Sequence, residues 1–396
     1  MARALIVERL STNRLMTGLM AALGLTVLGL AGLVVGGELL VRGASNLAAA
    51  ARISPLIIGI TVVSFGTSAP ELAVTVQAAY AGSPELAVGN VIGSNIANVL
   101  LILGAAALVT PLAVQSRIVK VDLPMVVAAS LGLWLLSLDG GLTYWDGALL
   151  FAVLVVYLIW TVREGQREAD AVKQGFAETA KTVGATGTAD RSAPRRPAGQ
   201  LIKQGLLVAG GLILLVIAAR AMVTGASEIA LAFGVSELVI GLTVVAVGTS
   251  LPELVASVVA SLRGQGDIAV GNVVGSNLFN ILAVLGIGAM VAPDGIPVSP
   301  DALRLDVPIM IAATFACLPL VFTGCRISRA EGALLLGYFV AYTAYVTMGA
   351  TDAAYTRSFE TAMIGFVIPL TILAVAFSVY QTIQAKRRRS HCEPES

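Results

Sequence analysis

The chain has 396 residues, of which 57% are hydrophobic and only 12% are charged. Soluble globular proteins contain about 25% charged residues, so this composition excludes an ordinary soluble domain and indicates a protein that lies mostly in lipid. A formal net charge of +1 also excludes the strongly basic surface that nucleic-acid binding requires.

Apolar runs separated by turn residues predict an all-α polytopic membrane protein, because a helix of about 20 apolar residues crosses the hydrocarbon core of a bilayer. The first run, residues 15–41, is longer than the apolar region of a cleavable signal peptide, and we interpret it as a retained helix. The predicted spans, in chain order, cover residues 17–41, 54–80, 85–109, 121–138, 145–162, 201–232, 236–262, 267–291, 303–323, 330–349 and 359–384.

An internal repeat relates the two halves of the chain. Residues 59–104 align without gaps on residues 241–286, with identical residues at 25 of 46 positions. Each copy belongs to a group of five predicted spans, and an odd number of spans makes the second copy enter the membrane from the opposite side. We therefore expect two inverted five-helix repeats with ten core helices. The predicted units are a first repeat over 17–162, a polar and flexible linker over 163–200, a second repeat over 201–349 and an additional span over 359–384.

The distribution of Lys and Arg supports this topology, because these residues collect in cytoplasmic loops. With a cytoplasmic linker, nineteen of the 25 Lys and Arg residues lie on the cytoplasmic side and five lie outside. Arg3, Arg9 and Arg14, which precede the first span, are the discordant feature. We expect a multi-pass protein whose linker and C-terminus are both cytoplasmic.

Two acidic residues lie in the middle of predicted spans, one in each repeat. Glu71 and Glu253 both end the string Gly-Thr-Ser-x-Pro-Glu, and a carboxylate at bilayer depth costs enough free energy that it usually has a function. The proline of each string cannot bond the carbonyl four residues earlier. The strings therefore predict a cation site made of these carboxylates, nearby hydroxyl groups and freed carbonyls. Its candidate ligands are Thr67, Ser68 and Glu71 with the carbonyl region of Gly66, and Thr249, Ser250 and Glu253 with that of Gly248.

A second repeated string, Gly-Asn-Val-x-Gly-Ser-Asn, adds neutral oxygen atoms. Ser94 in this string and Asn98, three residues after its end, share one helical face, as do Ser276 and Asn280 in the other repeat. An all-oxygen set of ligands suits Ca2+, whereas soft transition metals prefer Cys or His. The three cysteines have no metal-binding spacing, and the single histidine, His391, lies in a charged tail.

Other residues of the repeats have simpler interpretations. The Gly-x-x-x-Gly pairs Gly89 with Gly93 and Gly271 with Gly275 indicate close packing of helices more often than ligand binding. Asp122 and Asp306, each followed by x-Pro at the start of a predicted helix, are expected to be helix caps.

The paired strings GTSAPE and GTSLPE, with GNVIGSNIAN and GNVVGSNLFN, resemble the two alpha-repeats of the calcium/cation antiporter superfamily, specifically its prokaryotic sodium/calcium exchanger branch. The resemblance implies a Ca2+ site between the two glutamates, flanking Na+ sites, and alternating access by sliding of the first helix of each repeat. It also implies a bacterial inner-membrane location, Ca2+ and Na+ as substrates, no cofactor, no enzymatic activity and no protein partner. The ligands carried over are Thr67, Ser68, Glu71, Ser94, Asn98, Thr249, Ser250, Glu253, Ser276 and Asn280.

One position departs from the family pattern and keeps several functions open. Some exchangers of this branch have an aspartate where this chain has Asn280, so this site carries two formal negative charges instead of three. Na+/Ca2+ antiport is the leading hypothesis, and Ca2+/H+ antiport is its nearest alternative. A cation channel and a membrane enzyme with two catalytic carboxylates are the remaining alternatives.

Overall fold

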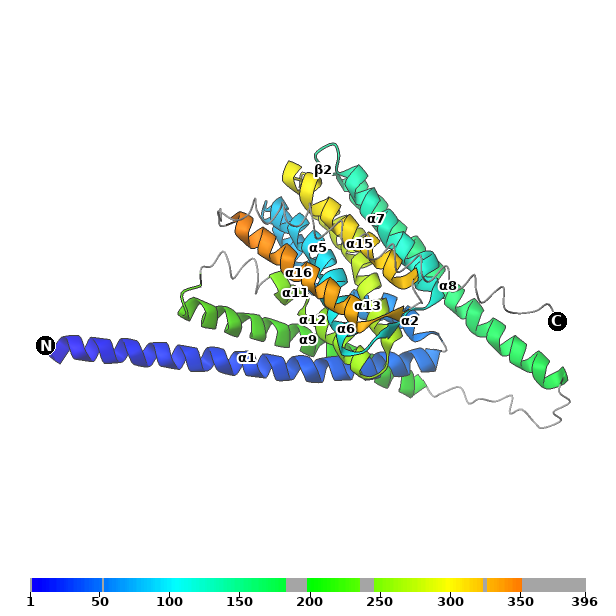
Figure 1. Cartoon of the computed structure of the whole chain (residues 1–396), viewed down its shortest axis with the longest axis horizontal. Helices are drawn as coiled ribbons and strands as arrows, with labels where there is room; N and C mark the ends of the chain where they lie inside the picture. The colour runs from blue at the N-terminus through cyan, green and yellow to red at the C-terminus, as the bar shows by residue number, and fades with distance from the viewer. Residues whose placement is uncertain (1, 52, 183–197, 236–245, 323–325, 351–396) are drawn as a thin grey trace.

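The computed structural model describes residues 2–51, 53–182, 198–235, 246–322 and 326–350. The predicted C-terminal span, 359–384, lies outside these residues, and the predicted span 236–262 is described only from Ala246. Figure 1 shows the described part as a bundle of helices with two long helices along one side.

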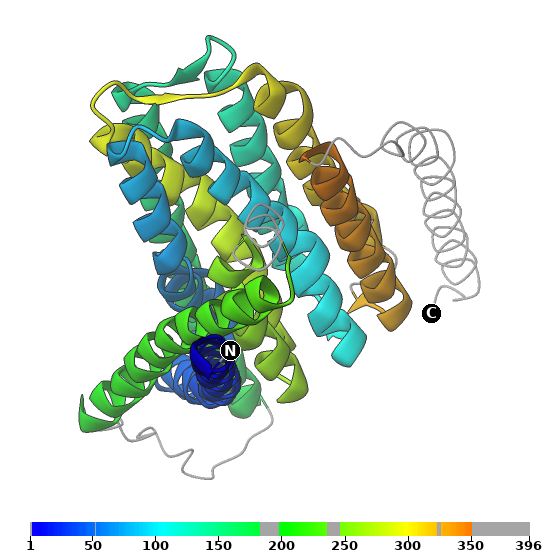
Figure 2. The same cartoon turned by 90° about the vertical axis from the view of Figure 1, so that its left-hand side faces the viewer.

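Those two long helices are α1 (Ala2–Ala51) and α9 (Ala198–Ala232), the first helices of the two predicted repeats. Small residues let their backbones approach: a Cβ atom at Gly29 would lie 2.6 Å from the Met222 nitrogen, and one at Gly43 would lie 2.9 Å from the Val208 nitrogen. Because the contacts move down α9 as they move up α1, the pair is antiparallel. Figure 2 shows α1 end-on beside α9 at the edge of the molecule.

Each repeat contributes a corresponding series of further elements. In the first repeat these are α2 (Pro55–Ile58), η1 (Gly59–Val63), α3 (Ser64–Thr67), α4 (Ala69–Tyr80), α5 (Pro84–Ala97), η2 (Asn98–Ile102), α6 (Leu103–Val109), β1 (Leu112–Ala113), η3 (Ile118–Asp122), α7 (Leu123–Leu136), β2 (Gly141–Leu142) and α8 (Tyr144–Thr182). In the second they are α11 (Ala246–Thr249), α12 (Leu251–Leu262), α13 (Gly266–Phe279), η5 (Asn280–Leu285), α14 (Gly286–Val291), β3 (Ile296–Pro297), η6 (Ala302–Asp306), α15 (Val307–Phe322), β4 (Arg326–Ile327) and α16 (Arg329–Ala350).

Two short antiparallel strand pairs connect the repeats. Strand β1 pairs with β4, with Leu112 opposite Ile327, and strand β2 pairs with β3, with Leu142 opposite Ile296. In each pair, the loop after the third helix of one repeat meets the loop after the fourth helix of the other repeat. Loops of these two kinds lie on the same side of the membrane only if the repeats are inverted, so the pairing agrees with the predicted topology.

The centre of the bundle consists of the spans that carry the second repeated string. The most apolar 18-residue window of Pro84–Val109 is 78% buried and that of Gly266–Val291 is 89% buried, compared with 17% for Thr17–Ala51. Among the described residues, six helices are long and apolar enough to cross a membrane, and a seventh counts if the bent pair Pro55–Thr67 and Ala69–Tyr80 is one span. Helices α15 and α16 occupy the predicted spans 303–323 and 330–349.

Glycine residues fix the packing in this centre. A Cβ atom at Gly271 would lie 2.8 Å from the Leu56 carbonyl oxygen, and one at Gly275 would lie 2.5 Å from the Ile60 carbonyl oxygen. Helix α13 therefore lies directly against the backbone of α2 and η1. The predicted packing role is confirmed for Gly271 and Gly275 and is not found for Gly89 and Gly93, where an added Cβ atom would have no neighbour within 4 Å in the described part of the chain.

Several element boundaries differ from the sequence prediction. Helix α8 continues to Thr182, twenty residues beyond the predicted end of its span, and α9 begins at Ala198, so helix occupies more than half of the segment that was expected to be a flexible linker. Wider π-helical turns interrupt the central spans at η2 and η5. Two further π-helical turns, η3 and η6, come directly before α7 and α15. The hydrophobic pattern does not distinguish these turns from α-helix.

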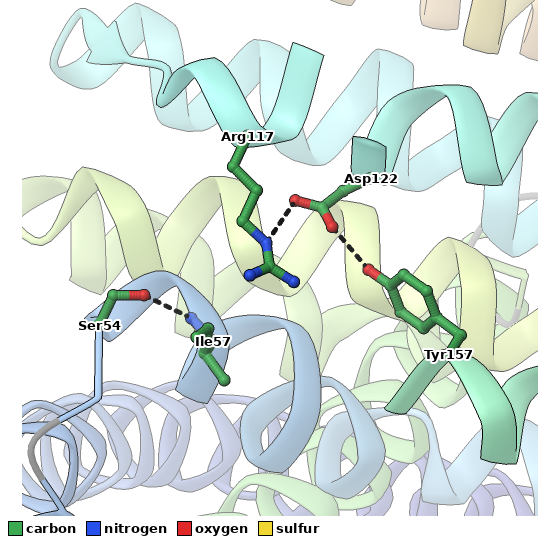
Figure 3. Close-up of polar contacts among 5 residues, drawn as sticks. All are labelled: Ser54, Ile57, Arg117, Asp122 and Tyr157. Carbon is green, nitrogen blue, oxygen red and sulfur yellow. Dashed lines mark hydrogen bonds and ion pairs between the residues drawn. The ribbon is translucent and has the colours of Figure 1, made fainter. Parts of the chain in front are cut away.

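The cap prediction for Asp122 is wrong. Its side chain makes no capping bond to the start of α7 and is instead fully buried. It accepts a 2.8 Å hydrogen bond from the Tyr157 hydroxyl and lies 3.5 Å from Nε of Arg117, whose guanidinium group lies over the Trp160 ring. Figure 3 shows Arg117, Asp122 and Tyr157 pointing toward one another. Asp122 thus links the turn η3 to α8. A buried carboxylate is stable only with charged or hydrogen-bonding partners, and here Arg117 and Tyr157 supply them.

Candidate cation site

The two buried glutamates lie at breaks in equivalent helices. The backbone leaves the helical conformation at Ser68, with φ −79° and ψ 4°, and at Ser250, with φ −88° and ψ 6°. In both places a proline follows two residues later in the first turn of the next helix, as expected for a residue that lacks an N–H group. Glu71 and Glu253 then lie in the first turns of α4 and α12, where they are 0% and 1% exposed.

The repeats exchange hydrogen bonds at these carboxylates. Ser250 donates a 3.3 Å hydrogen bond to Oε1 of Glu71, and Ser68 donates a 3.5 Å hydrogen bond to Oε1 of Glu253. Each serine precedes the glutamate of its own repeat by three residues but bonds the glutamate of the other. The two broken helices therefore converge on one place between the repeats.

The two threonines of the first string are not equivalent. Thr67 is fully buried and donates a 3.2 Å hydrogen bond to Oδ1 of Asn272, on α13 of the other repeat. Thr249 is half-buried, and its Oγ1 has no hydrogen-bond partner among the described residues. The first repeat is therefore more tightly joined to its neighbour at this point than the second.

Side chains in the second string and three residues after it supply further buried oxygen atoms. Ser94, Asn98, Ser276 and Asn280 are all at most 3% exposed. The asparagines begin the π-helical turns η2 and η5, and such turns inside α-helices occur frequently at functional sites. These four side chains come from the two most deeply buried spans.

Gly66 and Gly248 have a packing role that the sequence did not reveal. A Cβ atom at Gly66 would overlap the Leu212 side chain of α9, and one at Gly248 would overlap the Val223 side chain of the same helix. Pro70 and Pro252 follow four residues later, so neither glycine carbonyl can receive the usual helical hydrogen bond. Both glycines therefore have freed carbonyls and are also contact points for α9.

Six buried oxygen atoms of these motifs have no hydrogen-bond partner within the described ranges. They are Oε2 of Glu71, Oε2 of Glu253, Oδ1 of Asn98, Oδ1 of Asn280, Oγ of Ser276 and Oγ1 of Thr249. Buried polar atoms are normally satisfied, and an unpartnered buried group destabilises the fold by about 1–3 kcal/mol. Oxygen atoms from both repeats that share this property form a set suited to a hard cation.

The sequence analysis missed a pair of asparagines that hold the broken helices in place. Asn90 donates to the Glu71 carbonyl oxygen at 3.2 Å and to Thr75 at 3.0 Å. Asn272 donates to the Glu253 carbonyl oxygen at 3.3 Å and to Ser257 at 3.0 Å. The signal was present, since each asparagine is the second residue of the second repeated string and lies nineteen residues after the glutamate of its own repeat.

The donor set is hard and contains only two carboxylates. Among the described residues, no group of three or more His, Cys, Asp and Glu side chains is placed to hold a metal ion. Cys317, the cysteine whose surroundings are described, is buried and unbridged. Hydroxyl, amide and backbone oxygens must therefore complete the coordination of any cation between Glu71 and Glu253.

Comparisons with known proteins agree with this geometry. The family model described as sodium/calcium exchanger protein matches residues 21–163 and 203–348, which correspond closely to the two repeats. The chain is 40% identical over 322 residues to the putative antiporter CaxA of Alkalimonas amylolytica, covering 80% of this chain and 95% of that protein. It is 32% identical over 341 residues to the sodium/calcium exchanger MaX1 of Methanosarcina acetivorans, covering 80% of this chain and 95% of that protein.

The fold is also similar to solved structures. The sodium-calcium exchanger NCX_Mj, soaked with 10 mM Na+ and zero Ca2+, superimposes with a TM-score of 0.68 at 29% sequence identity, covering 82% of this chain and 98% of that chain. The same exchanger soaked with 10 mM Na+ and 10 mM Sr2+ gives a TM-score of 0.67 at 30% identity, with the same coverage. With inverted repeats, paired buried glutamates and a matching family model over most of its length, the chain belongs to the sodium/calcium exchanger family of membrane antiporters.

Proposed function

We propose that the protein exchanges Ca2+ for Na+ across the membrane, at a site made by Glu71 and Glu253 with the serine, threonine and asparagine side chains around them. The observation that carries the proposal is the set of six buried oxygen atoms, drawn from both repeats, that lack a partner in the described part of the chain. A cation between the repeats would be coordinated by these oxygen atoms and would be their common partner. Similarity to the sodium/calcium exchanger MaX1 supports the choice of ions.

The charges at the site fit one Ca2+ ion. Two carboxylates would balance its two positive charges, and the neutral oxygens of Asn98, Asn280 and Ser276 would raise the number of ligands toward the 6 to 8 that Ca2+ prefers. Na+ is also a hard cation, so it would use the same oxygen atoms. Because one set of ligands would serve both ions, binding of one would exclude the other and couple their movements.

The arrangement of the repeats supports alternating access. Secondary transporters often bind their substrate near the bilayer midplane, where broken helices of two repeats meet. Here the α1 and α9 pair lies at the edge of the bundle and contacts the broken spans through Gly37, Gly66 and Gly248. Sliding of this pair would press on the helices that carry the glutamates. We place the protein in the bacterial inner membrane with residues 163–200 and the C-terminus in the cytoplasm, following the distribution of Lys and Arg.

Ion flux in reconstituted vesicles tests the proposal. Vesicles loaded with Na+ and diluted into Na+-free medium should take up external Ca2+, and uptake should stop when the Na+ gradient is removed. Glu71→Gln and Glu253→Gln should each abolish uptake, because each removes one of the two charges while leaving the packing volume unchanged. Glu331→Gln, at the start of α16 and away from the site, is the matched control. Normal uptake by either site variant would contradict the proposal.

Ca2+/H+ exchange is the second candidate, and Asn280 is the observation that favours it. With an amide at this position the site has two carboxylates, so three Na+ ions would leave an excess positive charge, whereas two protons would neutralise both glutamates. A protonophore separates the candidates. Uptake that ignores the Na+ gradient and collapses with the protonophore would replace Na+ by H+ as the coupling ion.

A further inference from the structure

Four buried asparagines form a bridge between the repeats, and the turns η5 and η2 that two of them begin contact α4 and α12, the helices that carry Glu71 and Glu253. Asn95 and Asn98 belong to the first repeat, Asn277 and Asn280 to the second, and each is at most 2% exposed. They come from the spans at the centre of the bundle, which lie against each other. Asn98 and Asn280 begin the π-helical turns η2 and η5, and Asn95 and Asn277 precede them by three residues.

The two hydrogen bonds between these asparagines have the same pattern of donor and acceptor. Nδ2 of Asn98 donates to Oδ1 of Asn277 at 3.0 Å, and Nδ2 of Asn280 donates to Oδ1 of Asn95 at 3.3 Å. In both, the donor is the asparagine of the π-helical turn and the acceptor is the earlier asparagine of the opposite repeat. Nδ2 of Asn95 in turn lies 3.5 Å from Sδ of Met310, which leaves the Asn95 oxygen as the atom that faces Asn280.

This pattern determines which amide atoms are available to bind a cation. The amide of asparagine carries its oxygen and nitrogen on opposite arms, so an amide whose nitrogen is held by an acceptor turns its oxygen the other way. Oδ1 of Asn98 and Oδ1 of Asn280 are the oxygens freed in this manner, and both are buried without a partner among the described residues. If either amide turned over, it would present two N–H donors to a positive ion.

We propose that Asn95 and Asn277 are positioning residues that hold the amides of Asn280 and Asn98 with their oxygens toward the transported cation. Neither positioning residue needs to touch the ion. This inference rests on the proposed function, because it assumes that a cation binds between the glutamates. It makes cation affinity depend on an acceptor at position 277 and at position 95.

Two substitutions at position 277 separate positioning from packing. Asn277→Leu keeps the branched arrangement of four side-chain heavy atoms but has no acceptor, so the Asn98 amide is free to turn over. Asn277→Asp keeps an oxygen facing Nδ2 of Asn98. Measured as Ca2+ binding to the purified full-length protein by isothermal titration calorimetry, Asn277→Leu should weaken affinity about tenfold, the effect of losing roughly one ligand bond to a charged group. Asn277→Asp should bind within about threefold of the wild type or more tightly.

A double-mutant cycle tests whether position 277 acts through Asn98. In an Asn98→Leu background there is no amide left to orient, so Asn277→Leu should change Ca2+ affinity by less than about twofold. A residue with only a packing role would weaken binding by the same factor in both backgrounds. Equal factors, or an Asn277→Asp variant that binds as poorly as Asn277→Leu, would overturn the inference.

The second repeat offers an independent version and the controls. Asn95→Leu and Asn95→Asp, with Asn280→Leu as the background, repeat the cycle on the opposite side and decide the question if Asn277→Leu is not recovered as a monodisperse protein. Absence of Ca2+ and Na+ binding in the wild type would sink the proposed function and this inference together. Ca2+ binding that is lost in Glu71→Gln but unchanged in Asn277→Leu and Asn95→Leu would refute this inference alone.

Discussion

Asn272, on a helix of the second repeat, accepts a 3.2 Å hydrogen bond from Thr67 of the first repeat. Its Nδ2 also donates to the Glu253 carbonyl oxygen and to Ser257. One amide therefore connects both broken helices. Asn90, its counterpart, makes the two corresponding bonds to Glu71 and Thr75.

This difference predicts unequal effects of two matched substitutions. Asn272→Ala removes three hydrogen bonds from buried groups, and Asn90→Ala removes two. Each lost bond costs about 1 kcal/mol, so Asn272→Ala should lower the apparent melting temperature in detergent more than Asn90→Ala does. Equal decreases in melting temperature, or a smaller one for Asn272→Ala, would show that the Thr67 bond does not stabilise the protein.

The crossed serine bonds predict a symmetric loss of transport. Ser68→Ala and Ser250→Ala each remove a hydroxyl that donates to the carboxylate of the other repeat, and a bond to a charged group contributes about 1.5–3 kcal/mol. Ca2+ uptake in vesicles at subsaturating Ca2+ should fall about tenfold or more in both variants. Ser130→Ala is the control, because Ser130 is equally buried but bonds only the Val126 carbonyl of its own helix; it should transport normally.

The broad architecture was predictable because it depends on periodic features of the sequence. Apolar runs predicted helical spans, because a chain in lipid must satisfy its backbone polar groups internally. The gapless repeat, with an odd number of spans in each copy, predicted the inversion. The all-α fold and the inversion are both confirmed. The glutamates were found for the same reason, since an unpaired carboxylate in an apolar run stands out. Gly271 and Gly275 were also interpreted correctly, because only a missing side chain allows α13 to approach η1.

The details that failed depend on contacts between distant segments. Asp122 has the sequence context of a helix cap, but Tyr157 and Arg117 reach it only after the chain folds. The role of Asn272 requires Thr67, which is 205 residues away. The π-helical turn that begins at Asn280 continues through an unbroken run of apolar residues, so the sequence has no local feature that distinguishes it from α-helix.

Close packing at Gly275 predicts a strong local effect on stability. A Cβ atom there would overlap Oγ of Ser64 and lie 2.5 Å from the Ile60 carbonyl oxygen. Gly275→Ala should therefore destabilise the protein by about 1–3 kcal/mol, the usual cost of overpacking. Gly132→Ala in α7 has no neighbour within 4 Å of the new methyl group and should be neutral or slightly stabilising. Thermal unfolding of the two variants in detergent gives the comparison.

The buried ion pair of Arg117 and Asp122 predicts a loss that a second substitution repairs. Asp122→Asn leaves the guanidinium group without its countercharge, and an uncompensated buried charge destabilises a protein by about 3–5 kcal/mol. Arg117→Leu with Asp122→Asn removes both charges and should recover most of that stability. Tyr157→Phe, which removes one 2.8 Å hydrogen bond, should cost about 1 kcal/mol. Additive losses in the double variant would show that the pair is not coupled.

A charge added at Asn280 predicts opposite changes in stability and in cation affinity. In Asn280→Asp, the carboxylate has no N–H group to donate to Oδ1 of Asn95, and it adds a third negative charge near Glu71 and Glu253. Without cations the variant should therefore unfold at a lower temperature than the wild type. A bound Ca2+ would relieve this repulsion, so the rise in melting temperature on adding Ca2+ should be larger than in the wild type, and titration should show affinity at least about tenfold higher. Asn277→Asp adds the same charge on the same helix but keeps an acceptor for Asn98, which controls for charge alone. If Asn280→Asp binds Ca2+ no more tightly than the wild type, position 280 does not contact the ion.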